Sequence, residues 1–362
     1  MKLDTSIPVA VQASTTSLGA WPRDQGGFDW AVAVLSAMFV GGLFLDGWAH
    51  THGHVDQSFF TPWHAVFYAS YAAVALVLGA TAVRNHAHGR AWPEAVPSGY
   101  GLSLLGALVF AVGGIGDLIW HTVFGIEIGV EALLSPTHLA LAVGLGLISS
   151  GPVRAAWRRA ELAPAWRAQG PMVLALTATF SVFTFFTEYA HPLIFVAAGA
   201  NRPHGGGEAI GIASVLLQSI LLDATILLAV RSGPLPSGGL TLLVGANAAA
   251  MGFLSFSGDY PLALVVGAGV AGLLVDGLYA LLRPAPARPV VWGLFASLVP
   301  AAYYLCYFLA LLMIGGISWS VHLWTGSIVL AGLAGWLVGC LVVGAARAPG
   351  RGLTTSVPAG ST

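Results

Sequence analysis

The sequence predicts an all-α, polytopic integral membrane protein, and three features of the chain lead to this class. Hydrophobic residues make up 57% of the 362 residues and charged residues only 8%, whereas a soluble domain carries about 25% charged residues. Apolar segments of roughly 20 residues recur along the chain, each long enough to cross about 30 Å of hydrocarbon as a helix. The 47 glycines fit the close packing of helices in membranes.

These segments predict ten transmembrane helices, joined by short loops into a single domain over residues 29–345. A polar segment, 1–28, precedes this domain and a tail, 346–362, follows it. The first 27 residues lack the apolar core of a cleavable signal peptide. The predicted spans are 29–49, 59–83, 99–121, 133–150, 171–190, 209–230, 239–256, 261–282, 289–313 and 321–345.

The positive charges predict the orientation of these spans. With the N-terminus in the cytoplasm, only Arg202 of the fourteen lysine and arginine residues lies outside, which is the bias expected of a membrane protein. We therefore expect a multi-pass protein of the cell (plasma) membrane with both termini in the cytoplasm. The residues on the cytoplasmic side are Lys2, Arg23, Arg84, Arg90, Arg154, Arg158, Arg159, Arg167, Arg231, Arg283, Arg288, Arg347 and Arg351.

Histidine is concentrated on the opposite side of this predicted topology. His86 and His88 fall in a cytoplasmic loop, and the other nine of the eleven histidines lie at outer span ends or in outer loops. Neutral imidazoles have no topological reason to gather there, so the enrichment indicates a functional site on the extracytoplasmic side. These nine are His50, His52, His54, His64, His121, His138, His191, His204 and His322.

A motif in the N-terminal half occurs twice, once in residues 41–69 and once in residues 113–142. Each copy has an aspartate followed four residues later by a histidine, then an outer loop, then a Thr/Ser-Pro-x-His step. The repeat unit is a predicted helical hairpin, and internal repeats are common in membrane proteins. The two sets of polar side chains are Asp46, His50 and His64, and Asp117, His121 and His138.

The spacing predicts that each hairpin gathers its three polar side chains at one membrane depth. Residues four apart share one helix face, so each aspartate lies beside its following histidine at the outer helix end. Thr61 and Ser135 are natural N-caps, and Pro62 and Pro136 suit the first helical position. The last histidine of each copy then falls in the first turn of the returning helix, where the helix dipole favours neutral imidazole.

One carboxylate and two imidazoles form a suitable ligand set for copper, zinc or non-haem iron. The cysteines, Cys306 and Cys340, lie inside apolar runs, so we expect nitrogen and oxygen ligands. A charge at this depth costs roughly 2.5–3.5 kcal/mol, which a bound cation would offset. The alternative is an aspartate–histidine hydrogen bond at a helix end, and its recurrence in both hairpins favours metal binding.

Five further residues are additional candidates for the metal site. His52 and His54 lie in the first outer loop, and Glu131 lies in the second on a predicted short amphipathic helix. Glu188 and His191 form a Glu-x-x-His step at the outer end of the fifth span, a spacing that occurs twice in di-iron carboxylate sites and once here. For the loop residues, a solvated polar surface is the alternative.

The Asp-x-x-x-His pair with a later histidine on the next helix resembles the copper site in the C subunit of particulate methane and ammonia monooxygenases. The resemblance covers roughly 20–25 residues per copy, and it maps onto the six aspartates and histidines of the two hairpins. The longer spacing between the two histidines and the duplication depart from the family pattern. The resemblance implies helical membrane ligands, favours copper over iron and zinc, and implies a monooxygenase-like oxidoreductase.

Three functions remain open from the sequence. The first is a membrane metalloenzyme that oxidises a small apolar or lipid-soluble substrate and takes electrons from a donor or partner subunit. The second is a copper or zinc transporter or delivery protein. The third is a non-catalytic scaffold whose histidines sense pH. The expected partners include the lipid bilayer and exclude nucleic acid, because the formal net charge is -1.

Overall fold

The computed structural model describes residues 25–54, 61–125, 127, 129–159, 163–199, 207–255 and 260–347. Within these ranges the chain is helical, apart from turns and one isolated bridge between Gly199 and Ile317. The elements are α1 (Gln25–Thr51), α2 (Pro62–Ala87), α3 (Trp92–Ala95), α4 (Gly101–Phe124), α5 (Val130–Leu134), α6 (Pro136–Ser149), α7 (Gly151–Trp157), α8 (Trp166–Phe186), η1 (Glu188–Ala190), α9 (Gly207–Arg231), α10 (Gly239–Leu254), α11 (Tyr260–Leu282), α12 (Pro289–Ile314) and α13 (Val321–Arg347).

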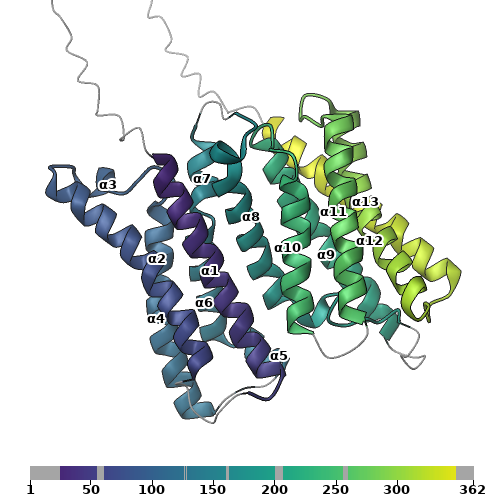
Figure 1. Ribbon diagram of the computed structural model, residues 1–362, viewed down its shortest axis with the longest axis horizontal. Helices are drawn as coiled ribbons and strands as arrows, with labels where there is room; N and C mark the ends of the chain where they lie inside the picture. Colours follow the sequence, from purple (N-terminus) through teal and green to yellow (C-terminus); the bar gives the residue numbers. More distant parts are fainter. Residues whose placement is uncertain are drawn as a thin grey trace, which may run out of the picture.

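The long helices lie side by side as a bundle, which confirms the predicted all-α class (Figure 1). Among the described residues, nine helical segments are long and apolar enough to cross a membrane, with α6 and α7 together forming one of them. The remaining predicted span, 239–256, corresponds to α10, which has only 16 residues and therefore a length of about 24 Å. It nevertheless runs alongside α8 and α11 (Figure 1).

Helix α8 begins earlier than the predicted fifth span, which started at residue 171. Pro171 lies inside this helix and cannot donate to the carbonyl of Arg167. The indole Nε1 of Trp30 on α1 donates to that carbonyl instead, at 3.1 Å. The helix also ends at Phe186 rather than near residue 190, because Thr187 is its C-cap and the chain then turns through η1.

The two hairpins with the duplicated motif are tightly packed through glycines. A Cβ on Gly42 of α1 would lie 2.9 Å from the Cα of Phe67 on α2. In the second hairpin, a Cβ on Gly106 of α4 would lie 2.7 Å from the carbonyl oxygen of Gly144 on α6. Glycine at such positions lets helix backbones approach closely. This close approach brings the polar ends of each helix pair within reach of one another.

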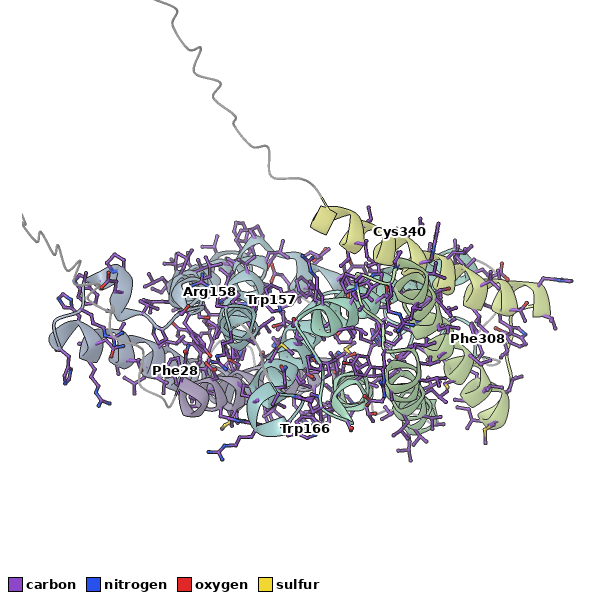
Figure 2. The ribbon with its side chains drawn as sticks, turned by 90° about the horizontal axis from the view of Figure 1, so that it is seen from above. Phe28, Trp157, Arg158, Trp166, Phe308 and Cys340 are labelled. Carbon is purple, nitrogen blue, oxygen red and sulfur yellow. The ribbon has the colours of Figure 1, made fainter. Side chains whose placement is uncertain are left out.

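The two ends of the bundle differ in charge. Helix α1 begins and α13 ends at the upper end in Figure 1, which Figure 2 shows from above. Every described lysine or arginine lies at this end, which we call the arginine end. The opposite end, where α5 lies, carries the motif residues and is called the triad end. Most of the predicted terminal segments 1–28 and 346–362, namely residues 1–24 and 348–362, lies outside the described residues, as do Arg202 and His204.

A buried polar cluster joins three elements near the arginine end. The carboxylate of Asp29 on α1 is 1% exposed and accepts a hydrogen bond from the Tyr100 hydroxyl at 2.6 Å. It also pairs with the guanidinium of Arg159, which follows α7. Since a buried carboxylate is costly without partners, this cluster fixes α1 against α4 and α7.

Candidate metal centre

The first hairpin forms one compact group of a carboxylate and two imidazoles. Asp46 and His50 lie on the last turns of α1, and His64 lies in the first turn of α2. The Asp46 Oδ2 atom is 3.8 Å from His50 Nε2 and 3.6 Å from His64 Nε2. One ligand atom from each residue lies within 4.8 Å of the other two. We call Asp46, His50 and His64 the first triad.

The second hairpin repeats this arrangement with shorter distances. Asp117 and His121 lie near the end of α4, and His138 lies in the first turn of α6. The Asp117 Oδ1 atom is 3.5 Å from His121 Nε2 and 3.1 Å from His138 Nε2. It also accepts a hydrogen bond from Thr137 Oγ1 at 2.9 Å. We call Asp117, His121 and His138 the second triad.

The N-cap hydroxyls orient one imidazole in each triad. Thr61 Oγ1 accepts the backbone N–H of His64 at 3.1 Å and lies 3.0 Å from its ring Nδ1. Ser135 Oγ has the same relation to His138, at 3.4 Å and 2.9 Å. An Nδ1–H that donates to this hydroxyl leaves the Nε2 lone pair facing the carboxylate. Metal-binding histidines commonly have an outer partner of this kind.

The separations between donor atoms fit a metal ion in each triad. Metal–nitrogen and metal–oxygen bonds of roughly 2.0–2.2 Å in tetrahedral geometry place ligands about 3.3 Å apart. The carboxylate–imidazole distances in the two triads range from 3.1 to 3.8 Å. Within the described part of the chain, the buried Oδ1 of Asp46 has no hydrogen-bond donor. A cation would satisfy this oxygen.

The two triads face one cavity rather than two separate ones. The cavity has a volume of about 190 Å³ and lies between α1, α2, α4, α6 and the end of α8. All six triad residues line it, together with Glu127 and Glu188. The described lysine and arginine residues all lie at the arginine end, so among the described residues only imidazoles are cationic partners for these carboxylates. The charge of the site therefore favours bound cations.

Apolar side chains complete the cavity wall and close the bundle beneath it. Leu133, Leu141, Phe185 and other apolar residues line the cavity. Toward the arginine end, the interior is filled by buried aromatic residues such as Phe39 and Phe110, whose ring centroids are 4.8 Å apart. The cavity thus combines the polar triad residues and two glutamates with a lining that is otherwise largely apolar.

Glu188 and His191, which the sequence placed together, face different cavities. Glu188 follows α8 and lines the triad cavity, where burial raises its pKa to about 7. His191 is 3% exposed and lines a separate small cavity with Gln218 and Asn247. Its Nδ1 accepts the backbone N–H of Leu193 at 3.2 Å, and burial lowers its pKa to about 3. The short turn of η1 separates the two side chains.

His52 and His54 are packed on an aromatic residue outside the cavity. Both rings stack on Trp48, with centroid separations of 4.9 Å and 5.2 Å. His52 Nδ1 also lies 2.9 Å from the Trp48 carbonyl oxygen. Neither residue lines the triad cavity, so the structure does not bring them to the triads.

The acidic residue of the second outer loop that reaches the site is Glu127. Glu131 lies exposed on α5 and does not line the cavity. Glu127 Oε2 is 3.9 Å from His138 Nδ1, and Glu127 Oε1 accepts the indole N–H of Trp120. The sequence alone did not indicate that Glu127, rather than Glu131, would contact Trp120 and His138. The conformation of the chain after α4 decides which of the two glutamates turns toward the cavity.

Tyr68 is a further cavity residue that the sequence motif did not reveal. It lies one helical turn after His64 on α2, and the two rings stack with centroids 6.3 Å apart. A Cβ on Gly114 of α4 would lie 3.1 Å from the Tyr68 hydroxyl, so this glycine makes room for the phenol. The His-x-x-x-Tyr spacing on one helix face was the available signal.

Comparison of the chain with models of protein families, with curated proteins and with solved structures finds no match.

Proposed function

We propose that this chain is an integral membrane metalloprotein in which each triad holds one metal ion at the shared cavity. The observation that carries the proposal is the repeated Asp-His-His geometry around one chamber at the end of the bundle that has no described lysine or arginine. Both sets of ligands come from the ends of helices, which suits a rigid resident site.

Copper is the favoured metal, with iron and zinc as alternatives. Two imidazoles and one carboxylate suit all three ions, and divalent copper binds such donors most tightly of the first-row metals. The sequence resemblance to the copper-binding monooxygenase subunit supports the same choice. Three protein ligands in each triad leave a coordination position for a small molecule, as in catalytic metal sites.

The activity that we propose is oxidation of a small apolar or lipid-soluble substrate with dioxygen. The hydrocarbon wall around Leu141 and Phe185 admits such a substrate next to the ligands. A bound copper or iron ion would supply the redox chemistry, whereas the chain supplies the binding chamber and the carboxyl group of Glu188 as a proton-exchanging group. Electrons come from a separate donor or partner subunit, because the sequence has no haem, nucleotide or iron–sulfur motif.

A metal transporter is the second function considered, and the packing under the cavity argues against it. The aromatic cluster of Phe39, Phe67 and Phe110 fills the interior between the triads and the arginine end. A translocation path needs polar groups or water at that depth.

A pH-sensing scaffold is the third function considered. It does not account for an aspartate beside both imidazoles in each hairpin.

We further propose that the arginine end faces the cytoplasm of a cell membrane and that the triads lie near the extracytoplasmic face. The position of all described arginines at one end supports this orientation. The similar hairpin geometry supports an internal duplication as the origin of the two triads.

Metal titration of the apo protein tests the proposal. Purified protein in detergent would be titrated with divalent copper against a chromophoric chelator, alongside Asp117→Asn and the matched control Glu131→Gln. We expect two binding events in the wild type and in the control, and one in Asp117→Asn. Equal titration of all three proteins would contradict the second site. Dioxygen consumption by the loaded protein with a reductant and an alkene then tests the oxidase activity separately.

A further inference from the structure

A second cavity lies at the arginine end, far from the triads along the bundle. It has a volume of about 730 Å³ and is formed by α3, the start of α4 and the end of α7 (Figure 1). Three arginines line it: Arg90, Arg154 and Arg158, of which Arg158 is labelled in Figure 2. This volume falls within the roughly 300–1,000 Å³ of typical small-molecule sites.

The cavity carries a net positive charge. Its three guanidinium groups face one carboxylate, that of the exposed Glu94. Among the described residues, neither Arg154 nor Arg158 forms a salt bridge, whereas the adjacent Arg159 is paired with Asp29. The positive charges of Arg154 and Arg158 can therefore attract an anion.

The arginine side chains are held in place by neutral acceptors. Arg154 Nε donates to the Gly99 carbonyl oxygen at 2.9 Å, its Nη1 donates to Ser150 Oγ at 2.6 Å, and its Nη2 donates to Ser103 Oγ at 2.8 Å and to Leu147 O at 2.9 Å. Arg158 Nη1 donates to Ser98 Oγ at 3.2 Å. These bonds fix the guanidinium groups without neutralising them. Arg158 uses only Nη1 in its bond to Ser98 and can offer paired N–H donors to phosphate oxygens, whereas Arg154, whose donors are largely taken by the protein, contributes mainly its positive charge.

The surroundings of this cavity combine an exposed tryptophan with an apolar helix face, as is typical of the boundary between headgroups and hydrocarbon. Trp92 on α3 is 56% exposed and stacks on His86 at 4.1 Å between ring centroids. Exposed tryptophan is typical of the membrane–water interface. Leu102, at the cavity rim, is followed along the outer face of α4 by the exposed Leu105 and Leu108. An apolar strip thus leads away from the positive cavity toward the bilayer centre.

We propose that this cavity binds the phosphate headgroup of an anionic phospholipid whose acyl chains lie along α4. The arginines bind the phosphate, and the leucine strip gives the chains an apolar surface, so one lipid satisfies both features. Basic pockets between transmembrane helices bind anionic lipid headgroups in this way. The site is independent of the metals proposed for the triads.

Native mass spectrometry of the full chain tests the lipid site. The protein would be exchanged into detergent with either phosphatidylglycerol or phosphatidylcholine, and bound lipids would be counted. The test variant is Arg90→Gln/Arg158→Gln, which spares the backbone contacts of Arg154. The control is Arg288→Gln, an exposed arginine at the same end outside the cavity. Unchanged thermal unfolding would verify that each variant folds.

We expect the wild type and the control to retain one phosphatidylglycerol and to discriminate against phosphatidylcholine. The double variant should lose about 25-fold in apparent affinity, since each of the two basic residues contributes roughly a factor of five near the membrane surface. Equal retention by the double variant would overturn the proposal. Complete displacement by millimolar inorganic phosphate would also overturn it, because the acyl chains would then contribute nothing and the ligand would be a free anion.

Discussion

The substitution Ser135→Ala removes one hydroxyl that has two structural roles in the second hairpin. The Ser135 Oγ caps α6 by accepting the backbone N–H of His138, and it also lies 2.9 Å from the ring Nδ1 of that residue. Ser135 is 5% exposed, so water does not readily replace the hydroxyl. We therefore expect both a less stable helix start and a less well oriented imidazole.

The two effects have different sizes and are measured separately. Loss of an N-cap costs about 1 kcal/mol of stability, and this loss should appear in the metal-free protein. Loss of an outer partner of a metal-binding histidine lowers metal affinity by roughly 10–100-fold, or about 1.4–2.7 kcal/mol. The buried position of Ser135 favours the larger value.

The assay compares thermal unfolding of the metal-free protein with chelator competition for divalent copper. Ser135→Thr is the matched control, because the first hairpin has threonine at the equivalent cap and the same ring contact. The control should retain both properties. A normal metal affinity in Ser135→Ala, together with reduced stability, would refute the argument that the hydroxyl orients His138 for a metal.

Three other perturbations give further predictions. Gly144→Ala places a Cβ 2.8 Å from the backbone nitrogen of Phe110 and should cost about 1–3 kcal/mol of stability in thermal unfolding, whereas Gly146→Ala meets nothing within 4 Å and should be silent. Burial raises the pKa of Glu188 to about 7. Between the usual pKa of a glutamate and 7, the folded protein therefore binds more protons than the unfolded chain, so its stability falls as pH rises through this window. Unfolding scans at several pH values should show a smaller slope of stability against pH in Glu188→Gln, and an unchanged slope would contradict the burial of this carboxyl group. Asp29→Asn should lower the free energy of unfolding by about 2 kcal/mol in the same assay. This is less than the cost of breaking a fully buried ion pair, because 25% of the Arg159 side chain is exposed. Unchanged stability would show that the cluster does not join the helices.

Local rules account for the part of the site that the sequence predicts. The aspartate and histidine of each pair share a helix face because they are four residues apart. Pro62 and Pro136 start the returning helices, with Thr61 and Ser135 as caps, as their side-chain chemistry dictates. Since a short connection must return each helix beside its partner, the third ligand of each triad could be predicted from the same stretch of chain.

The relation between distant segments could not be predicted in this way. Both hairpins face one cavity, and this depends on how α1 and α4 pack against α6 and α8. The loop conformation turns Glu127 inward and leaves Glu131 exposed, although both are glutamates in one short loop. The turn of η1 likewise separates Glu188 from His191, which a continuous helix would have kept on neighbouring faces.

The length of α8 shows a similar limit for secondary structure. Pro171 is a reasonable start for a helix by local chemistry, and the predicted span began there. The helix instead starts at Trp166, and the indole of Trp30 from another helix donates to the carbonyl that the proline leaves without a donor. A contact across 137 residues of sequence thus compensates for the proline, and local chemistry does not predict it.

The number of metal ions per chain tests the central claim most directly. Protein loaded with divalent copper and freed of excess metal would be measured by elemental mass spectrometry, together with Asp46→Ala/His50→Ala and Asp117→Ala/His121→Ala. We predict two ions in the wild type, one in each double variant and none when all four substitutions are combined. Copper at background level in the wild type, or two ions in either double variant, would contradict the assignment of the triads as metal sites.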